Sequence, residues 1–335
     1  KSRAQENFCA CSATLSMSRK IGVGLYGGNG HQVDHLLDGC PFGQLVAVSN
    51  LPLPTASRAT VHATLMEMFD DPRVELVSLC SPRRADQAAD AIACLHAGKH
   101  VYAEKPAAFT NEELDGILDV AAKTGRQFHE MADTVFRQPL HALRSLVRSG
   151  RLGEVVQVWA QKSYPASLAK RPQDESIDGG LIRQCAIHAV RMVEHLTGIP
   201  VSSCEALETK LGNPHAGDLH MAASLMLCLE NGGVASVIAN YCNPPGFGRH
   251  GNDQVRIFGT LGMAELTDDA RRSRVVIGDA DCGPLDASAE VEPYFHSYLK
   301  HLLGLGAMPM SLEEELHPLR TVNLAKSAAR LHAAS

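Results

Sequence analysis

The chain has 335 residues, of which 45% are hydrophobic and 20% charged, and its formal net charge is -6. This composition is typical of a folded globular protein with about two domains, and it excludes a disordered chain, a collagen-like fibre and a small disulfide scaffold. A mildly acidic chain without basic runs is poorly suited to bind nucleic acid, and no apolar stretch reaches the ~18 residues that a membrane span needs.

Residues 1–16 have no apolar core of the kind found in signal peptides, and Met17 stands just before the first apolar run. We interpret 1–16 as a tail or upstream extension. None of the ten cysteines forms a C-x-x-C pair, and several lie in apolar runs, such as Cys80 and Cys228. This pattern predicts reduced, buried thiols in a cytoplasmic protein.

Short apolar runs alternate with helical segments in the first half of the chain. Thr110 and Glu113 form a predicted capping box, and Gly125 would end the helix that they open. The alternation predicts βαβ units and a parallel sheet. The predicted strands are 21–26, 45–49, 74–79, 100–103 and 126–131, and the predicted helices are 31–38, 85–95 and 110–123.

In the second half, strands follow one another directly. After a strand at 154–161 and one long helix at 178–198, Asn231-Gly232 predicts a hairpin turn. Further helices are expected at 293–303 and from Ser311 toward Leu331, and Pro318 should kink or restart the last one. We therefore predict a largely antiparallel sheet with a helix on one face. Its strands are 221–230, 234–241, 255–258, 263–266 and 274–277.

The first strand runs into a glycine-rich loop before a helix, which is the arrangement that binds dinucleotides. The spacing is imperfect, because Leu25 stands where the first glycine of G-x-G-x-x-G would fall if Gly30 is the last. The loop alone is equally consistent with a tight turn. The residues that would contact a nucleotide here are Gly27, Gly28, Asn29 and Gly30.

The carboxyl ends of the next strands complete the predicted cofactor site, because open α/β sheets bind ligands at that edge. Asn50 occupies the region where an acidic residue would bind the ribose of NAD, and an amide does not repel a 2′-phosphate. The choice between NAD and NADP is therefore open. We also place four strand-end residues in the site: Ser81, Pro82, Glu104 and Lys105.

A polar stripe follows the helix at 178–198. Gln184, His188, Arg191 and His195 share one face, opposite an apolar stripe. Such a stripe is most often the solvent-exposed side of a helix. If it lines a cleft instead, His188 is a natural general acid/base, and Gln184 and Arg191 would orient a polar substrate. Lys105 could then point its ammonium at a substrate oxygen.

Three stretches together resemble one family, the Gfo/Idh/MocA oxidoreductases (glucose-fructose oxidoreductase, inositol dehydrogenase and rhizopine catabolism). They are the glycine loop, AGKHVYAEKP at 97–106 and GGLIRQCAIH at 179–188, and the likeness extends over about 18–332. The resemblance implies an N-terminal Rossmann domain (17–137) and a C-terminal α/β substrate domain (138–335) whose last helix packs back toward the first domain. It also implies NAD or NADP, and a homo-oligomer, dimer or tetramer, formed through the open C-terminal sheet.

The resemblance further implies a sugar, cyclitol or sugar-acid-like substrate, with Lys105 and His188 holding its hydroxyl and managing the proton. Gln184 stands where the family has aspartate, and Arg191 adds positive charge, so the pKa of His188 should fall and an acidic or ketonic substrate would fit. We expect Lys105, His188 and Gln184 to be catalytic, and Lys105, Arg191 and Tyr164 to bind substrate. A non-catalytic sensor and an NAD-assisted lyase or glycosidase remain alternatives.

A metal site is not predicted, because His215, Asp218 and His220 lack a convincing ligand spacing.

Overall fold

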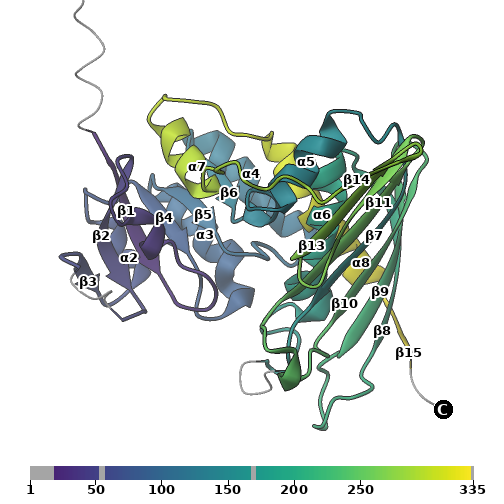
Figure 1. Ribbon diagram of the computed structural model, residues 1–335. Coiled ribbons are helices and arrows are strands. Elements are labelled where there is room, and N and C mark those ends of the chain that lie inside the picture. Colours follow the sequence, from purple (N-terminus) through teal and green to yellow (C-terminus); the bar gives the residue numbers. More distant parts are fainter. Residues whose placement is uncertain (1–18, 53–56, 167–170, 333–335) are drawn as a thin grey trace, which may run out of the picture.

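The structure is a computed structural model that describes residues 19–52, 57–166 and 171–332. The interpretation of 1–16 as a tail lies outside the described residues. Two sheets, one from each half of the chain, stand opposite each other with helices between them (Figure 1). In the part of the chain that is described, no helix combines the length and apolarity that crossing a bilayer requires.

The first sheet confirms the predicted parallel α/β organisation. Its six strands are all parallel in the order β3-β2-β1-β4-β5-β6. The strands are β1 (Ile21–Tyr26), β2 (Gly43–Ser49), β3 (Thr60–His62), β4 (Leu76–Leu79), β5 (His100–Ala103) and β6 (Phe128–Glu130). The helices are α1 (Asp34–Leu37), α2 (Leu65–Phe69), α3 (Gln87–His96) and α4 (Asn111–Thr124).

Local signals explain which of these elements the sequence predicts. The capping box of Thr110 and Glu113 opens α4, and Gly125 ends it with a φ of 64°. Helix α1 is shorter than predicted, because the segment before it remains a loop whose Gln32 side chain donates to the carbonyls of Tyr26 and Gly27. The sequence does not predict β3 or α2, which are too short to show a period.

The second sheet has nine strands in the order β14-β13-β12-β11-β7-β10-β9-β8-β15. The hairpin predicted at Asn231-Gly232 is confirmed as β9–β10, and Gly232 takes the positive φ (86°) that this turn needs. Strands β11 and β12 form a second antiparallel pair. Parallel pairing occurs between β7 and β10 and between β8 and β15. The strands are β7 (Val155–Ser163), β8 (Val201–Thr209), β9 (Ala222–Leu229), β10 (Val234–Asn240), β11 (Asn252–Gly259), β12 (Gly262–Thr267), β13 (Arg272–Ile277), β14 (Ala280–Gly283) and β15 (Arg330–His332).

The predicted long helix forms on the inner side of this sheet, with one irregular turn. A π-helical turn at Ile182–Ala186 leads into α6 (Ile187–Thr197), which packs against β7 and against α5 (Leu140–Arg148). Gly198, with a φ of 77°, ends it. Turns of this kind occur frequently at functional sites.

Helices α7 (Tyr294–Leu302) and α8 (Leu312–Ala328) complete the core between the two sheets (Figure 1). The predicted restart at Pro318 is wrong, because this proline lies inside a single helix. Proline removes the amide that would bond Glu314, four residues earlier. The carbonyl of Glu314 is paired instead with the Nε2 atom of His195 at 2.9 Å, so the helix loses little by containing a proline.

The cysteine prediction is partly wrong. In the described residues no disulfide forms, and Cys40, Cys80, Cys94 and Cys185 are buried. Cys228, however, is exposed, because alternation along β9 turns it to the outer face of the second sheet.

Candidate active site

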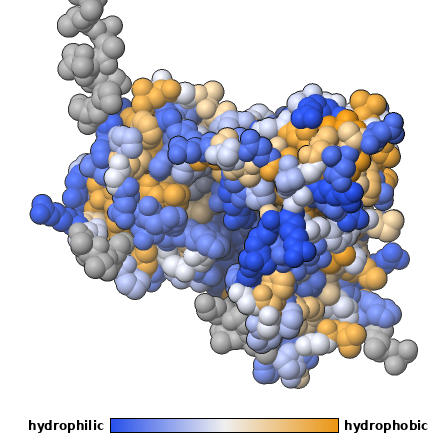
Figure 2. Space-filling view, viewed as in Figure 1, coloured by the Kyte–Doolittle hydropathy of each residue, from blue (hydrophilic) through white to orange (hydrophobic). Residues whose placement is uncertain are grey.

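A cavity of about 1010 Å³ lies between the two halves of the molecule. The surface is hollowed there, and hydrophilic side chains gather around the hollow (Figure 2). Its walls come from the ends of β5 and β6, the start of α6, the inner face of the second sheet and the start of α7. Lys105, Tyr164 and His188 all line it, although the sequence separates them widely.

Lys105 lies two residues after the end of β5 and is 8% exposed. Its Nζ atom donates to the main-chain oxygen of Gln184 at 2.9 Å and lies 3.4 Å from the Oε1 atom of the same residue. This main-chain oxygen belongs to the π-helical turn. Burial lowers the pKa of Lys105 to about 8, against the opposing effect of the nearby Glu104 carboxylate.

Gln184 contacts Lys105 but does not line the cavity. Its Nε2 atom donates to the main-chain oxygen of Asp178 at 2.5 Å, which turns Oε1 toward the ammonium. The amide therefore orients Lys105 without adding a charge beside it.

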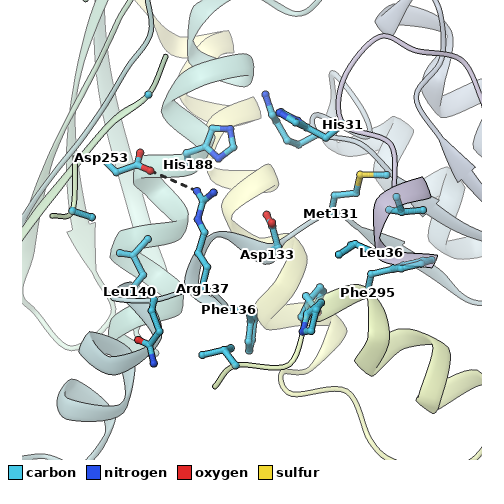
Figure 3. Close-up of a pocket in the computed structure, with 18 of the residues that line it drawn as sticks. His31, Leu36, Met131, Asp133, Phe136, Arg137, Leu140, His188, Asp253 and Phe295 are labelled. Atoms are coloured by element: carbon cyan, nitrogen blue, oxygen red, sulfur yellow. Dashed lines mark ion pairs between the residues drawn. The ribbon is translucent and has the colours of Figure 1, made fainter. Parts of the chain in front are cut away.

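His188 lies on α6 and points into the cavity (Figure 3). Its Nδ1 atom is 3.4 Å from Thr134 Oγ1, whereas its buried Nε2 atom has no hydrogen-bond partner among the described residues. Burial lowers the pKa of His188 well below 6.5, and the charges of Lys105 and Lys162 lower it further. The ring is therefore neutral near pH 7, with one nitrogen free for a ligand.

Arg191 does not reach the cavity. It is fully buried, pairs with Glu130 and donates to the main-chain oxygen of Met131 at 2.8 Å. Its guanidinium is therefore held by partners inside the protein, away from the cavity in which we expected it to bind substrate. His195 is also fully buried, so the interpretation of the stripe as a solvent-exposed face is wrong.

Tyr164 is 7% exposed and lines the cavity beside His188, with 6.2 Å between the two ring centroids. Lys162, two residues earlier, places its ammonium 5.0 Å from the centroid of the tyrosine ring. Lys162 is not among the site residues predicted from the sequence. The signal was available, because alternation along β7 puts Val158, Ala160 and Lys162 on the same buried side of the strand.

The glycine loop follows β1 and has the geometry of a pyrophosphate site. Gly27 has a φ of 72°, and a Cβ atom there would lie 2.1 Å from the main-chain oxygen of Cys80, so this position requires glycine. A Cβ atom on Gly28 would meet only Leu51, at 3.9 Å. Within the described residues, the amides of Gly28 and Gly30 have no acceptor from the protein. Two free amides at a glycine loop fit the phosphates of a dinucleotide.

Glu104 holds the glycine loop from below rather than facing the cavity freely. Its Oε2 atom accepts a hydrogen bond from the His31 amide at 3.0 Å, and a Cβ atom on Gly30 would collide with its side chain. Burial alone would raise the pKa of Glu104, but the His31 hydrogen bond and the charges of Lys105 and Arg84 lower it to about 2. Arg84, a further residue that the sequence analysis overlooks, donates to the Asn29 carbonyl in the same loop.

The remaining predicted cofactor residues surround this loop. Asn50 follows β2 in the left-handed conformation (φ 59°), next to Ser49 and without a carboxylate at the strand end. The Pro82 carbonyl accepts from Asn29 at 3.3 Å. The Ser81 hydroxyl turns away to Asp90 at 2.7 Å.

One cluster away from the cavity has metal-ligand chemistry. Glu175, Glu208 and His220 lie close enough to hold a cation, but the Nζ atom of Lys326 contacts the two carboxylates at 2.5 and 2.7 Å. The lysine supplies the positive charge in this cluster.

Comparisons with known proteins agree with this geometry. A family model for an oxidoreductase family with an NAD-binding Rossmann fold matches residues 21–131, and a model for the GFO/IDH/MocA C-terminal domain matches 140–265.

Three relatives illustrate the similarity. The chain is 26% identical over 246 residues to myo-inositol 2-dehydrogenase of Thermotoga maritima, covering 70% of each chain. It is 23% identical over 297 residues to an NADP+-dependent scyllo-inositol 2-dehydrogenase of Bacillus subtilis, covering 81% of each. It is 27% identical over 221 residues to an uncharacterized oxidoreductase of Bacillus subtilis, covering 64% of this chain and 61% of the relative.

A solved structure of levoglucosan dehydrogenase in complex with NADH and levoglucosan has the same fold. The two superpose with a TM-score of 0.76 at 18% sequence identity, over 92% of this chain and 97% of the other.

Proposed function

This chain belongs to the GFO/IDH/MocA oxidoreductase family, with its NAD-binding Rossmann fold, and we propose that it transfers hydride between NAD or NADP and a hydroxyl-bearing carbon of a sugar, cyclitol or sugar acid. The observation that carries the proposal is the shared cavity of Lys105 and His188, in which the Nε2 atom of His188 is buried and has no partner in the part of the chain that the structure describes. The inositol substrates of two relatives support the substrate class.

The cofactor, when bound, supplies the hydride acceptor or donor. The amides of Gly28 and Gly30 would hold its pyrophosphate, and the carboxyl ends of β4 and β5 would border the rest of it. The choice between NAD and NADP stays open. Asn50 carries no charge that would repel or bind a 2′-phosphate, and the relatives include an NADP+-dependent enzyme.

In the proposed reaction, the neutral ring of His188 takes the proton of the substrate hydroxyl at Nε2 when the alcohol is oxidised, and returns it in the reverse direction. The ammonium of Lys105 donates a hydrogen bond to the same oxygen and stabilises the negative charge that develops there. Gln184 keeps Lys105 in place through its two oxygens. In family members with aspartate at this position, a negative charge stands beside the histidine. The neutral amide of Gln184 leaves Lys105 and His188 in a more positive environment.

The test is hydride transfer by the purified protein. Incubation with NAD+ or NADP+ and a panel of sugars, cyclitols and sugar acids should produce the absorbance of reduced nicotinamide. His188→Ala should lower turnover by about 10²–10⁴-fold, because a positioned acid/base contributes in that range. Cofactor affinity should be unchanged in this variant, since the amides of Gly28 and Gly30 would hold the pyrophosphate.

Tight cofactor binding without turnover on any substrate would favour a non-catalytic sensor and reject the dehydrogenase. Unchanged turnover in His188→Ala would remove this residue from the mechanism.

A further inference from the structure

We propose that the substrate of this cavity is a polyol that carries a carboxylate, and that Arg137 and Lys162 bind that carboxylate beside His188. The inference rests on the proposed function, since it names the class of substrate for the same site. It starts from three cavity-lining residues on three different segments: Arg137 before α5, Lys162 on β7 and Asp253 on β11.

Lys162 is a buried cation, with its side chain 6% exposed. Its Nζ atom pairs with Asp253 Oδ1 at 2.6 Å. A Cβ atom on Gly251 would lie 3.1 Å from that ammonium, so the glycine leaves room for it. A buried ammonium has three donors, and within the described residues one anionic partner uses only part of them.

Arg137 shares the same carboxylate. Its guanidinium lies 3.5 Å from Asp253 Oδ2 and is half exposed, at 49%. Figure 3 shows Arg137 and His188 pointing into the same space, with the Arg137–Asp253 ion pair beside them. No hydrogen bond from the Arg137 side chain to another described residue satisfies its donors. A guanidinium with unused donors presents them in one plane, in a geometry that matches the two oxygens of a carboxylate.

The balance of charge at this end of the cavity is positive. Lys105, Lys162 and Arg137 face His188, and Asp253 is shared by two of them. The charge of Lys105 is offset by Glu104, whose Oε1 atom lies 3.9 Å from the ammonium. Of the other carboxylates that line the cavity, Asp269 pairs with Arg249, and Asp133 and Glu290 stand on the η2 turn (Asp133–Val135) and on the segment before α7.

This arrangement favours an anionic substituent near the reacting carbon. Asp253 serves two cations, buried Lys162 and half-exposed Arg137, so these three groups carry one excess positive charge, which an anion entering the cavity would offset. A single carboxylate matches that one excess charge, whereas a phosphoryl dianion would exceed it.

The test compares acids with their neutral counterparts by isothermal titration calorimetry on the full-length protein saturated with NAD+ or NADP+. The pairs are D-glucuronate with D-glucose, D-galacturonate with D-galactose, and D-gluconate with D-glucitol. At least one acid should bind about tenfold to a hundredfold more tightly than its partner, because hydrogen bonds to charged groups contribute in that range.

Arg137→Gln should reduce this preference to less than about threefold, as expected when a charge-assisted bidentate contact becomes a neutral one. Arg271→Gln is the matched control, because Arg271 also lines the cavity but pairs with Asp268 in its own turn. The control should keep the preference of the unmodified protein.

Equal binding of every acid and its neutral partner would overturn the inference, and so would an equal loss in Arg137→Gln and Arg271→Gln. Tighter binding of D-glucose 6-phosphate than of all three acids would overturn the assignment of a carboxylate. Tight binding of an acid without hydride transfer would keep this inference and reject the proposed dehydrogenase, so the two failures are distinguishable.

Discussion

The two residues that carry the proposed chemistry owe their properties to burial among cations. Lys105 and His188 both lose affinity for a proton because water is excluded around them, and neighbouring positive charges add to the effect. His188 is therefore neutral near pH 7. Lys105 remains mostly an ammonium at that pH, held by the oxygens of Gln184.

Lys105 should impose a pH limit on the reaction. Its pKa is lowered to about 8, so the ammonium predominates below pH 8 and the neutral amine above it. We predict that kcat/KM falls above pH 8, because the amine stabilises a developing alkoxide less well. The pH–rate profile measures this limb directly. Lys105→Arg, which stays charged, should lack the limb at any residual rate.

The opposite dependence of kcat/KM on pH would assign the proton transfer to Lys105. A kcat/KM that rises through pH 8 in the unmodified protein and loses this rise in Lys105→Arg would show that the neutral amine of Lys105 is the proton acceptor. The roles assigned to Lys105 and His188 would then be exchanged.

At the scale of elements, the site depends on how α6 is fixed against the first sheet. Arg191 follows His188 by one turn of α6 and pairs with Glu130 at the end of β6. Glu315, on α8, accepts hydrogen bonds from His129 and from the amide of Glu130 at 2.6 Å each. These buried contacts join α6, α8 and β6 around the cavity.

Arg191→Met should destabilise the protein by about 3–5 kcal/mol, because it leaves the carboxylate of Glu130 buried without its cation. The free energy of unfolding from urea titration measures the loss. Without Arg191 the pKa of Glu130 rises further above its unfolded value, so the ionised form opposes folding above that unfolded pKa. The loss should therefore be larger at pH 8 than at pH 5.

The double variant Arg191→Met with Glu130→Gln is the control, because it removes both charges. It should recover part of the stability at pH 8. A single variant as stable as the unmodified protein would contradict the structural role of this pair.

At the scale of the whole molecule, the outer face of the second sheet is uncovered by any described element (Figure 1). Alternation places apolar side chains on it, among them Leu207, Met226 and Val234, which are 46%, 70% and 47% exposed. These side chains stand on the face through which we expect the chain to form a homo-oligomer, and burial in such an interface would remove them from water.

Met226→Glu should shift the protein toward the monomer, because it buries a charge in the proposed interface. Size-exclusion chromatography with light scattering gives the mass. Met66→Glu is the matched control, since Met66 is equally exposed, at 66%, but lies on α2 in the other half. A monomeric unmodified protein at high concentration would reject the interface.

The fold was largely predictable because its signals are local. The period of the apolar residues, the capping box at Thr110 and the Asn231-Gly232 turn each act over a few residues. The glycine loop was also visible, although only the structure shows that a side chain at Gly27 would collide with Cys80. Elements too short to show a repeating pattern of apolar residues, such as β3, could not be predicted from the sequence.

What the sequence alone determined is the alternation of strands and helices, the change from a parallel to an antiparallel sheet, and the candidates Lys105 and His188. The packing of distant segments determines the rest. It pairs Arg191 with Glu130 and turns Lys162 and Arg137 toward the cavity. It also places His195 against the Glu314 carbonyl, which has no amide partner at Pro318. The reason is physical. Periodicity assigns a residue to a face of its element, but the partner of a buried charge comes from another element, and its identity depends on how distant segments pack.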